Sequence, residues 1–482
     1  MLETKNYIAG TYVDDSYEKI NVVSPIDGTI LSTMPMSDAA AVNQAVEVAK
    51  KAFTSWSKKT LKERVQVFFR FRNLLEQHRD ELIALVHQEN GKTKGEAAAE
   101  VDKGIELCEF ACSLPQIVND EVQEVSKGVE CRTTHVPMGV VASITPFNFP
   151  HMVPLWSVPN ALALGNCMIL KPSELVPLSA IRIGELLTEA GLPEGVYNVV
   201  NGGKAVVEAI CDHPDIKAVS FVGSTKVAKI VYQRATSNLK RCAALGGAKN
   251  HLIVLDDAHV DMAASNIAAS MSGCAGQRCM AASAMVAVGQ VDHIIARLCE
   301  EAQKIICGEN LGAVISAEAK ARIEGYITAA EAAGAEILVD GRNTVVAGKE
   351  GGFYVAPTII DKVTPDMAIA KEEVFGPVLA IMRTDTIDEA LEIENASNYG
   401  NAAAVFTQSG GLARYIMDRV SAGMVGVNVG VPVPREPFSF GGWNDSRFGS
   451  HDITGRSSIA FWTYLKKTTT KWNPEAKTNW MS

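Results

Sequence analysis

The hydrophobic positions from residue 38 to residue 112 repeat with the period of a helix. In the run LKERVQVFFRFRNLLEQHRDELIALVHQENGKT, which begins at residue 61, apolar side chains recur at three- and four-residue spacing, and this spacing places them on one helix face. The pattern predicts helices over 38–60 and 61–112, with the quoted run ending near Gly91, since glycine commonly ends a helix. A helical region is therefore predicted over residues 38–112.

From about residue 139 the pattern changes to short apolar, β-rich runs that alternate with helical segments. The predicted strands are GVVASITP, CMILKPS, GVYNVVNG and KAVSFVGS, at 139–146, 167–173, 195–202 and 217–224. The predicted helices lie near 154–164 and at 178–191, 204–212 and 225–235. Strands that alternate with helices at this spacing form βαβ units, so a parallel sheet of the α/β class is predicted.

A second alternating region begins near residue 251. Its predicted strands are HLIVLD, AMVAVG and AEILVDG, at 251–256, 284–289 and 335–341, and its predicted helices span 261–274, 292–306 and 316–334. The chain then ends in an aromatic and β-branched run, IAFWTYLKKTTTKW (459–472), which is predicted to be a terminal strand. Because a strand with an exposed apolar side needs a partner, we expect it to meet another subunit.

Composition and charge limit the class of protein. A chain of 482 residues is too long for one core, so two or three structural units are expected. The formal net charge of −10 argues against a nucleic-acid surface, and no apolar run of about 18 residues predicts a membrane span. The N-terminus carries no export signal, and the ten cysteines include no C-x-x-C pair, so no metal site is predicted. A cytoplasmic protein with free thiols is the expectation.

Two short motifs after predicted strands suit a nucleotide. KPSE (171–174) and FVGS (221–224) lie where an open α/β sheet binds ligands, at the carboxyl ends of its strands. Lys171 would meet a ribose hydroxyl or a phosphate, Glu174 a ribose, and Gly223 with Ser224 a pyrophosphate near a helix start. The dinucleotide fingerprint G-x-G-x-x-G is absent here, and a turn glycine with a solvated lysine explains the same residues. Local chemistry alone leaves the nucleotide site open.

The candidates for chemistry are one amide and two thiols. Asn148, between two phenylalanines in TPFNFPHMVP (145–154), would present a fixed amide donor to a developing oxyanion; a turn asparagine is the alternative. In GCAGQRCMAA (273–282), Cys279 follows Arg278, whose charge favours thiolate over thiol. Cys274 falls in the preceding helical pattern, where a buried thiol acts as a small apolar side chain. These features leave Cys279 as either a nucleophile or a buried thiol.

Five motifs together identify a family. TPFNFP, ILKPSE, SFVGST, GQRC and KEEVFGPV resemble, in order and approximate spacing, the motifs of the aldehyde dehydrogenase superfamily over almost the whole chain. The resemblance implies the aldehyde dehydrogenase fold, an α/β fold with a Rossmann-like nucleotide-binding domain, an α/β catalytic domain and a bridging β-arm, assembled into homodimers or homotetramers. The implied segments are 1–115 and 137–246 for the NAD-binding domain, 247–440 for the catalytic domain, and 116–136 with 459–475 for the arm.

The resemblance also implies roles for residues. Cys279 would be the nucleophile, and the Asn148 side chain with the backbone N–H of Cys279 would form the oxyanion hole. A thiolate that adds to an aldehyde gives a thiohemiacetal, whose collapse passes a hydride to NAD and leaves a thioester. NAD is favoured over NADP because Glu174 beside a ribose would repel an extra phosphate. The residues implied for NAD are Phe147, Lys171, Glu174, Gly223, Ser224, Glu373 and Phe375.

One departure from the family pattern concerns release of the acyl group. Aldehyde dehydrogenases that release a free acid usually carry a glutamate, the general base for water, in a segment like LELGGK. Here the segment reads CAALGGAKNH (242–251), and alignment places Ala244 or, one register over, Leu245 at that position. No carboxylate occurs between Arg241 and Leu255. Coenzyme A is therefore the expected acyl acceptor, because a thiol depends less on an enzymic base than water does.

A narrower resemblance concerns the substrate. GGAKNH, PFNFPHMVP, AGQRCMA and SFGGWNDSRFG resemble the CoA-acylating methylmalonate (malonate) semialdehyde dehydrogenase group. In that group an arginine beside the nucleophile meets the substrate carboxylate, which implies Arg278. Lys103 stands where the group has a second arginine, a departure because an ammonium lacks the guanidinium fork; an exposed helix lysine is the alternative. The expected products are propionyl-CoA or acetyl-CoA, carbon dioxide and NADH.

Two other functions stay open at this stage. One is a hydrolytic dehydrogenase of succinate semialdehyde or a sulfonated aldehyde, which would recruit another base, either Glu373 or a C-terminal carboxylate. The other is a non-catalytic relative that keeps the fold as a binding or structural protein, although the nucleophile, the amide and the nucleotide motifs are all present.

Overall fold

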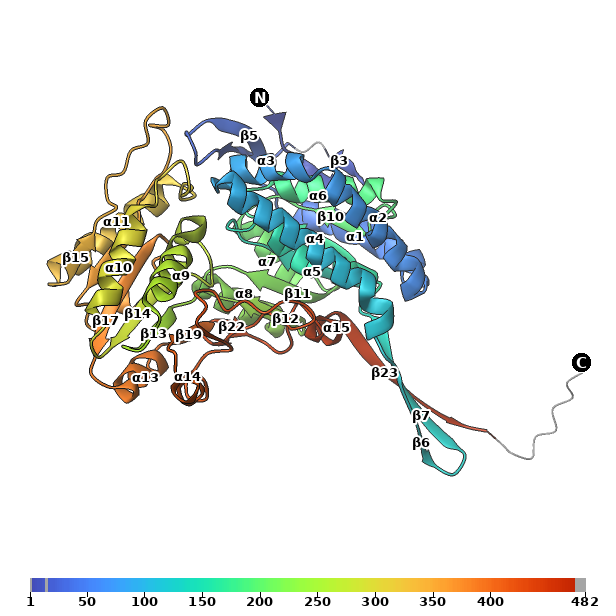
Figure 1. Ribbon diagram of the computed structural model, residues 1–482. Coiled ribbons are helices and arrows are strands. Elements are labelled where there is room, and N and C mark those ends of the chain that lie inside the picture. The colour runs from blue at the N-terminus through green and yellow to red at the C-terminus, as the bar shows by residue number, and fades with distance from the viewer. Residues whose placement is uncertain (1, 14–15, 473–482) are drawn as a thin grey trace, which may run out of the picture.

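Two large sheets dominate the computed structural model, which describes residues 2–13 and 16–472 (Figure 1). The first sheet has the order β22-β12-β11-β8-β9-β10-β2-β3. Its five central strands run parallel, while β2 and β22 join the two edges antiparallel. The strands are β2 (Asn6–Ile8), β3 (Thr11–Val13), β8 (Val140–Ile144), β9 (Cys167–Lys171), β10 (Tyr197–Val199), β11 (Ile216–Val222), β12 (Arg241–Leu245) and β22 (Arg447–Phe448).

The order of the parallel strands creates a crevice. From β8, the strands β9 and β10 follow in order toward one edge of the sheet. The next strands of the chain, β11 and β12, lie on the other side of β8. Adjacent strands β8 and β11 therefore send their following loops in opposite directions, which opens a crevice at their carboxyl ends. The predicted parallel sheet is confirmed, and both predicted nucleotide motifs follow strands that end at this edge.

Helices cover both faces of the first sheet. The helices α1, α7 and α8 pack on one face, and α5 and α6 on the other, beneath an outer layer of α2, α3 and α4. Apolar side chains from these layers form one continuous core. The helices are α1 (Ala39–Trp56), α2 (Leu61–Gln77), α3 (Arg79–Asn90), α4 (Lys94–Ile117), α5 (Met152–Ala163), α6 (Leu178–Glu189), α7 (Lys204–Asp212) and α8 (Thr225–Ser237).

The predicted helical region 61–112 is divided into three helices. The first break falls at His78, which ends α2 and begins α3. The helix α3 stops at Gly91, whose φ of 85° is left-handed, as the sequence predicted. A capping box of Thr93 and Glu96 then starts α4, in which each side chain bonds the other residue's backbone N–H. The turn between α3 and α4 places Lys92 and Glu96 beside the site described below.

The second sheet carries the order β15-β16-β17-β14-β13-β19-β20. All its strands are parallel except the edge strand β15. One core lies between this sheet and α9 with α10, and another between its opposite face and α11, α13 and α14. The strands are β13 (Asn250–Val254), β14 (Ala282–Val288), β15 (Glu336–Val339), β16 (Thr358–Asp361), β17 (Val378–Thr384), β19 (Ala402–Phe406) and β20 (Met424–Val427). The helices are α9 (Val260–Ser272), α10 (Asp292–Gln303), α11 (Ala317–Ala332), α12 (Ala368–Lys371), α13 (Ile387–Asn395) and α14 (Gly410–Met417).

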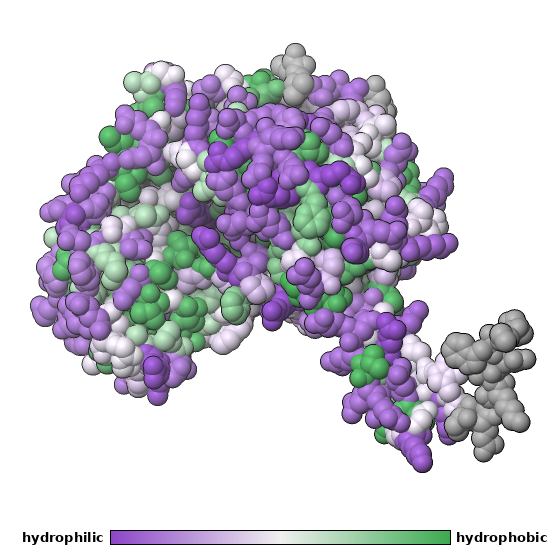
Figure 2. Space-filling model, turned by 45° about the vertical axis from the view of Figure 1, so that its right-hand side comes forward, coloured by the Kyte–Doolittle hydropathy of each residue, from purple (hydrophilic) through white to green (hydrophobic). Residues whose placement is uncertain are grey.

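A three-stranded arm projects from the body of the molecule (Figures 1 and 2). It consists of β6 (Glu121–Ser126), β7 (Val129–Pro137) and β23 (Thr463–Lys471) in the order β23-β7-β6. The sequence prediction for the last segment needs one correction. Its aromatic part is the helix α15 (Ser457–Trp462), in which Phe461 and Trp462 are fully buried in the core of the first sheet. The strand that follows pairs along one edge with β7 of the same chain.

Small elements complete the fold. A sheet of β1 (Leu2–Glu3), β5 (Ile30–Pro35) and β4 (Lys19–Val23) lies near the N-terminus, and β18 (Tyr399–Gly400) pairs with β21 (Trp443–Asn444). Among the helices of the described residues, none combines the length and the hydropathy that a membrane crossing requires. Of the segments implied by the sequence, residues 1, 14–15 and 473–475 lie outside the described residues.

Candidate active site

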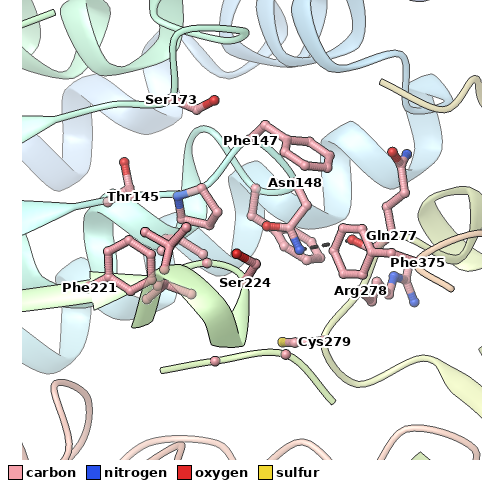
Figure 3. A pocket seen from close by; sticks show the side chains of 18 of the residues that line it. Thr145, Phe147, Asn148, Ser173, Phe221, Ser224, Gln277, Arg278, Cys279 and Phe375 are labelled. Atoms are coloured by element: carbon pink, nitrogen blue, oxygen red, sulfur yellow. Dashed lines mark hydrogen bonds between the residues drawn. The ribbon is translucent and has the colours of Figure 1, made fainter. Parts of the chain in front are cut away.

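One cavity is lined by residues from both halves of the molecule, those around the first sheet and those around the second. It has a volume of about 1640 Å³ and runs from the carboxyl edge of the first sheet, past Cys279, to the segment 431–436. All eleven residues with a predicted catalytic, cofactor-binding or substrate-binding role line it, so residues up to 272 positions apart, from Lys103 to Phe375, share one space. Figure 3 shows the Cys279 sulfur in this cavity, with Asn148 and Phe375 above it and Phe147 farther up in that view.

The end of the cavity beside the first sheet suits the adenosine part of a dinucleotide. Lys171 is buried at the end of β9, and its ammonium lies 2.9 Å from the Glu174 carboxylate. Burial raises the pKa of Glu174, but the charge and the hydrogen bond of Lys171, together with a backbone hydrogen bond, outweigh it, so the pKa lies below its ordinary value and the carboxylate is ionised. An ionised carboxylate accepts hydrogen bonds from ribose hydroxyl groups, and its negative charge repels a phosphate at the same place.

Gly223 and Ser224 form the turn into α8. Ser224 is the N-cap residue, but its side chain makes no capping hydrogen bond, so α8 begins without a side-chain cap. A Cβ at Gly223 would lie 2.6 Å from the Phe221 ring, so a side chain at position 223 would displace this ring. A helix N-terminus that opens on a cavity is suited to a pyrophosphate. These residues and the cavity size fit NAD.

The cysteine loop differs from the prediction at Cys274. The helix α9 ends at Ser272, so Cys274 is not part of it; Cys274 lies in the 3₁₀ turn η1 (Gly273–Gly276) with a φ of 52°. This left-handed backbone turns the chain sharply toward Cys279. Cys274 itself is buried, and its sulfur accepts a hydrogen bond from Arg278 Nε at 3.1 Å.

Side-chain amides hold the cysteine loop in place. The carbonyl oxygen of Cys279 accepts hydrogen bonds from Asn250 Nδ2 and Asn401 Nδ2, both at 2.8 Å. Gln277 Oε1 accepts the backbone N–H of Ile315 at 3.0 Å, which ties the loop to the second sheet's side of the cavity. The sequence motif GQRC contains Gln277, yet nothing in the pattern shows that its role is to anchor the loop. This anchoring restricts where the Cys279 thiol can point.

The surroundings of the Cys279 thiol disfavour its ionised form. The surrounding protein removes it from bulk water and raises its pKa to about 12, and the negative charge of Glu373 adds to this shift. Arg278 does lower the pKa of this thiol, in the expected direction, but its effect is smaller than the opposing effects of burial and Glu373. A base is therefore needed wherever this thiol gains or loses a proton.

Asn148 is hydrogen-bonded to the cysteine loop. Its Nδ2 donates to the carbonyl oxygen of Gln277 at 2.9 Å (Figure 3). This bond uses one of the two amide hydrogens and leaves the other for an oxyanion formed at Cys279. The side chain is buried, so its orientation is fixed before any substrate enters.

A buried ion pair supports the Asn148 loop. Lys92 Nζ donates both to Glu100 and to the carbonyl oxygen of Asn148. Glu100 in turn accepts the backbone N–H groups of His151 and Met152 at 2.9 and 3.1 Å. The side chains of Lys92 and Glu100 are 1% and 0% exposed, so both charges depend on this pairing. Sequence reasoning missed both residues, because neither belongs to a motif.

The two cations predicted to bind the substrate carboxylate differ in their environment. Arg278 lies beside Cys279, with its Nη2 3.8 Å from the Glu96 carboxylate. Lys103 on α4 is paired more closely: its ammonium lies 2.5 Å from Glu436 and 3.1 Å from Glu106. Lys103 is therefore neither a free cation nor the exposed helix lysine of the alternative. Its positive charge is already compensated within the chain.

The loop after β12 carries no acid. Ala244 and Leu245 belong to β12 and are buried, so in neither alignment does the side chain line the cavity. Gly246 and Gly247 line it instead. The carboxylate nearest this loop comes from Glu373, whose Oε1 accepts the Ala248 N–H at 2.9 Å. Phe375, two residues later, has a φ of 52°. Its ring packs edge-on against that of Phe147, with the ring centroids 5.8 Å apart.

Comparisons with known proteins agree with this geometry. A family model described as the aldehyde dehydrogenase family matches residues 12–468. The chain is 42% identical to a malonate-semialdehyde dehydrogenase of Pseudomonas aeruginosa, over 97% of this chain and 96% of that one. It is 44% identical to a malonate-semialdehyde dehydrogenase of Bacillus cereus, over 97% and 98% of the two chains.

Solved structures give the same result. A crystal structure of a methylmalonate-semialdehyde dehydrogenase from Oceanimonas doudoroffii superposes with a TM-score of 0.97 at 43% identity, covering 99% of both chains. A Sinorhizobium meliloti protein whose structure contains NAD superposes with a TM-score of 0.96 at 41% identity, covering 98% of both chains.

Proposed function

Because this chain belongs to the aldehyde dehydrogenase family and is an NAD-dependent member of it, we propose that it oxidises methylmalonate or malonate semialdehyde and transfers the acyl group to coenzyme A. The observation that carries the acyl-transfer part is the loop after β12, which presents Gly246 and Gly247 to the cavity and has no carboxylate among its own residues. The relatives named above support the choice of substrate.

In this proposal the chemistry proceeds on Cys279. Its thiol gives up a proton to solvent as the sulfur bonds to the aldehyde carbon, and the oxyanion that forms accepts hydrogen bonds from Asn148 Nδ2 and the Cys279 backbone N–H. Bound NAD would supply the acceptor for the hydride that leaves this carbon. A thioester remains on Cys279; its β-carboxylate leaves as carbon dioxide, and the resulting enolate takes up a proton from solvent. The thiol of coenzyme A then takes the acyl group, giving propionyl-CoA or acetyl-CoA.

The residues proposed for NAD divide between the two sheets. Lys171, Glu174, Gly223 and Ser224 hold the adenosine half at the switch point of the first sheet. Glu373 and Phe375 hold the nicotinamide-side ribose, and Phe147 packs beside them. The domain boundaries belong to the same proposal: 1–115 and 137–246 bind the nucleotide, and 247–440 carry the nucleophile.

The arm, residues 116–136 and 459–475, is proposed to join subunits into a homodimer or homotetramer. Val122 and Val125 on β6, and Tyr464 and Leu465 on β23, are exposed on it. Figure 2 shows such hydrophobic side chains as green patches on a largely hydrophilic arm. Exposed apolar groups on a projecting sheet are typical of a surface that another chain covers.

Dependence on coenzyme A tests the proposed function. Purified protein receives methylmalonate semialdehyde and NAD, with or without coenzyme A, and both NADH and the acyl product are measured. We expect multiple turnovers only with coenzyme A, and propionyl-CoA as the product. NADH turnover at the same rate without coenzyme A, with a free acid as product, would instead support the hydrolytic alternative.

The different pairing of Arg278 and Lys103 gives a prediction about substrate affinity. Arg278→Met should lower kcat/KM for methylmalonate semialdehyde by about 10- to 150-fold, because a charge-assisted hydrogen bond contributes roughly 1.5–3 kcal/mol. Lys103→Met should cost less than about 1 kcal/mol, because Glu436 already compensates that charge. Steady-state kinetics with propionaldehyde, which lacks the carboxylate, provides the control. Equal losses on both aldehydes would remove Arg278 from substrate recognition.

A further inference from the structure

We propose that Glu373 is a proton carrier in the acyl-transfer step: it takes the proton of the attacking coenzyme A thiol and delivers it to the departing sulfur of Cys279. This inference rests on the proposed transfer to coenzyme A. It adds to the proposed contact of Glu373 with the ribose, because that contact belongs to hydride transfer and the proton is moved afterwards.

The Glu373 carboxylate contacts the loop after β12, whose own residues include no acid. Its Oε1 accepts the Ala248 N–H at 2.9 Å. Its Oε2 lies so close to Gly247 that a Cβ there would be 2.1 Å away, so a side chain at position 247 would displace the carboxylate. The observed position of the Glu373 carboxylate therefore requires glycine at position 247.

The same segment packs against the cysteine loop. A Cβ at Gly276 would lie 2.0 Å from the carbonyl oxygen of Gly376, so the two backbones are in direct contact. Cys279 and Glu373 follow and precede these glycines by three residues each, and both line the cavity. The negative charge of Glu373 is the strongest charge effect on the Cys279 thiol. A carboxylate and a thiol therefore face one space in which an acyl group would lie.

The surroundings of Glu373 suit a group that exchanges a proton near neutrality. Burial raises its pKa to about 7, against the opposing effects of the Ala248 N–H, Lys249 and Arg322. Lys249 is buried and, among the described residues, its ammonium has no hydrogen-bond partner. Burial lowers the pKa of Lys249 to about 8, although Glu373 opposes this effect. Arg322 on α11 enters the same cavity.

Other titratable groups near Glu373 are accounted for. Burial and, to a smaller extent, the negative charge of Glu373 raise the pKa of the Tyr399 phenol above its ordinary value, so this phenol stays protonated near neutrality. Glu372 is exposed and accepts a hydrogen bond from the Tyr326 hydroxyl. Among the carboxylates of these segments, Glu373 is the one held on the loop beside Cys279.

The leaving group explains why a carrier is needed. The thiol of coenzyme A has an ordinary thiol pKa of about 8.5, whereas that of Cys279 lies at about 12. A sulfur with a high pKa leaves slowly as a thiolate. In the balanced step, the coenzyme A sulfur bonds to the acyl carbon and its proton moves to Glu373. The bond from that carbon to Cys279 then breaks, and Glu373 returns the proton to the Cys279 sulfur.

The experiment isolates this step by omitting NAD. p-Nitrophenyl acetate acylates Cys279 directly, and the burst of nitrophenol counts the enzyme that is correctly folded and acylated. Deacylation is then followed with and without coenzyme A in wild type, Glu373→Gln and Glu372→Gln. Because only acylated enzyme is counted, poor folding of a variant changes the burst and not the rate.

We expect coenzyme A to accelerate wild-type deacylation, with a rate that rises as pH increases through about 7 because Glu373 must be deprotonated to accept the thiol proton. Glu373→Gln should lower the coenzyme A-dependent rate by about 10²- to 10⁴-fold and lose this step in the pH profile, while Glu372→Gln matches wild type. Equal rates in Glu373→Gln and wild type would overturn the carrier alone. A wild-type rate that ignores coenzyme A would overturn the proposed acyl transfer and the carrier with it.

Discussion

Cys279→Ala should abolish aldehyde oxidation, with kcat falling on the order of 10⁴-fold or more. The proposed bond to the aldehyde carbon cannot form without the sulfur, and no other group takes over the role of a covalent nucleophile. Asn148 and the nucleotide-binding residues remain, so the variant should still bind NAD. NADH formation measures the first result, and titration with NAD measures the second.

Cys299→Ala provides the control for this experiment. Cys299 is a partly exposed free thiol on α10, away from the residues that line the cavity. Its replacement should leave turnover within about a factor of two, as surface substitutions usually do. If Cys279→Ala retains a substantial part of the wild-type rate, the thioester mechanism is wrong for this protein.

Lys92→Met should lower the free energy of unfolding by about 3–5 kcal/mol, the typical cost of leaving one charge of a buried pair without its partner. Glu100 would keep only the N–H groups of His151 and Met152 in a place with no access to solvent. The carbonyl oxygen of Asn148 would lose its donor as well. A loss of kcat should therefore accompany the loss of stability.

Urea unfolding compares this variant with two others. In Lys92→Met/Glu100→Leu both charges are gone, so most of the lost stability should return. Lys94→Met removes an exposed lysine two positions away and should change stability by less than about 0.5 kcal/mol. Similar unfolding midpoints for Lys92→Met and Lys94→Met would show that the ion pair does not support the Asn148 loop.

The alternation of strands and helices was predictable because it depends on local periodicity. The helix predicted at 204–212 begins and ends at those residues, and the predicted strands overlap those observed. The end of α9 was not predictable to the residue, because the left-handed turn at Cys274 uses a non-glycine residue that loop packing holds in place. Local patterns carry no signal of such a constraint.

The candidate site was found from motifs, but its electrostatics was not. That Arg278 precedes Cys279 is visible in the sequence, whereas the stronger effects of burial and Glu373 depend on the fold. Lys103 and Glu436 are 333 positions apart, so their pairing appears only when α4 and the C-terminal segment meet. Lys92 and Gln277 were missed for the same reason: each acts through a backbone group that is remote in sequence.

The arm also constrains the order in which the chain can complete its structure during synthesis. His135 and Thr463, which share a hydrogen bond across the arm, are 328 positions apart. While the ribosome makes the intervening residues, one edge of β7 stays open, and so does the edge of β12 that β22 later covers. Open strand edges invite pairing with other chains. A nascent chain arrested before residue 447 would therefore be prone to aggregate, and protection should come only with the final segment.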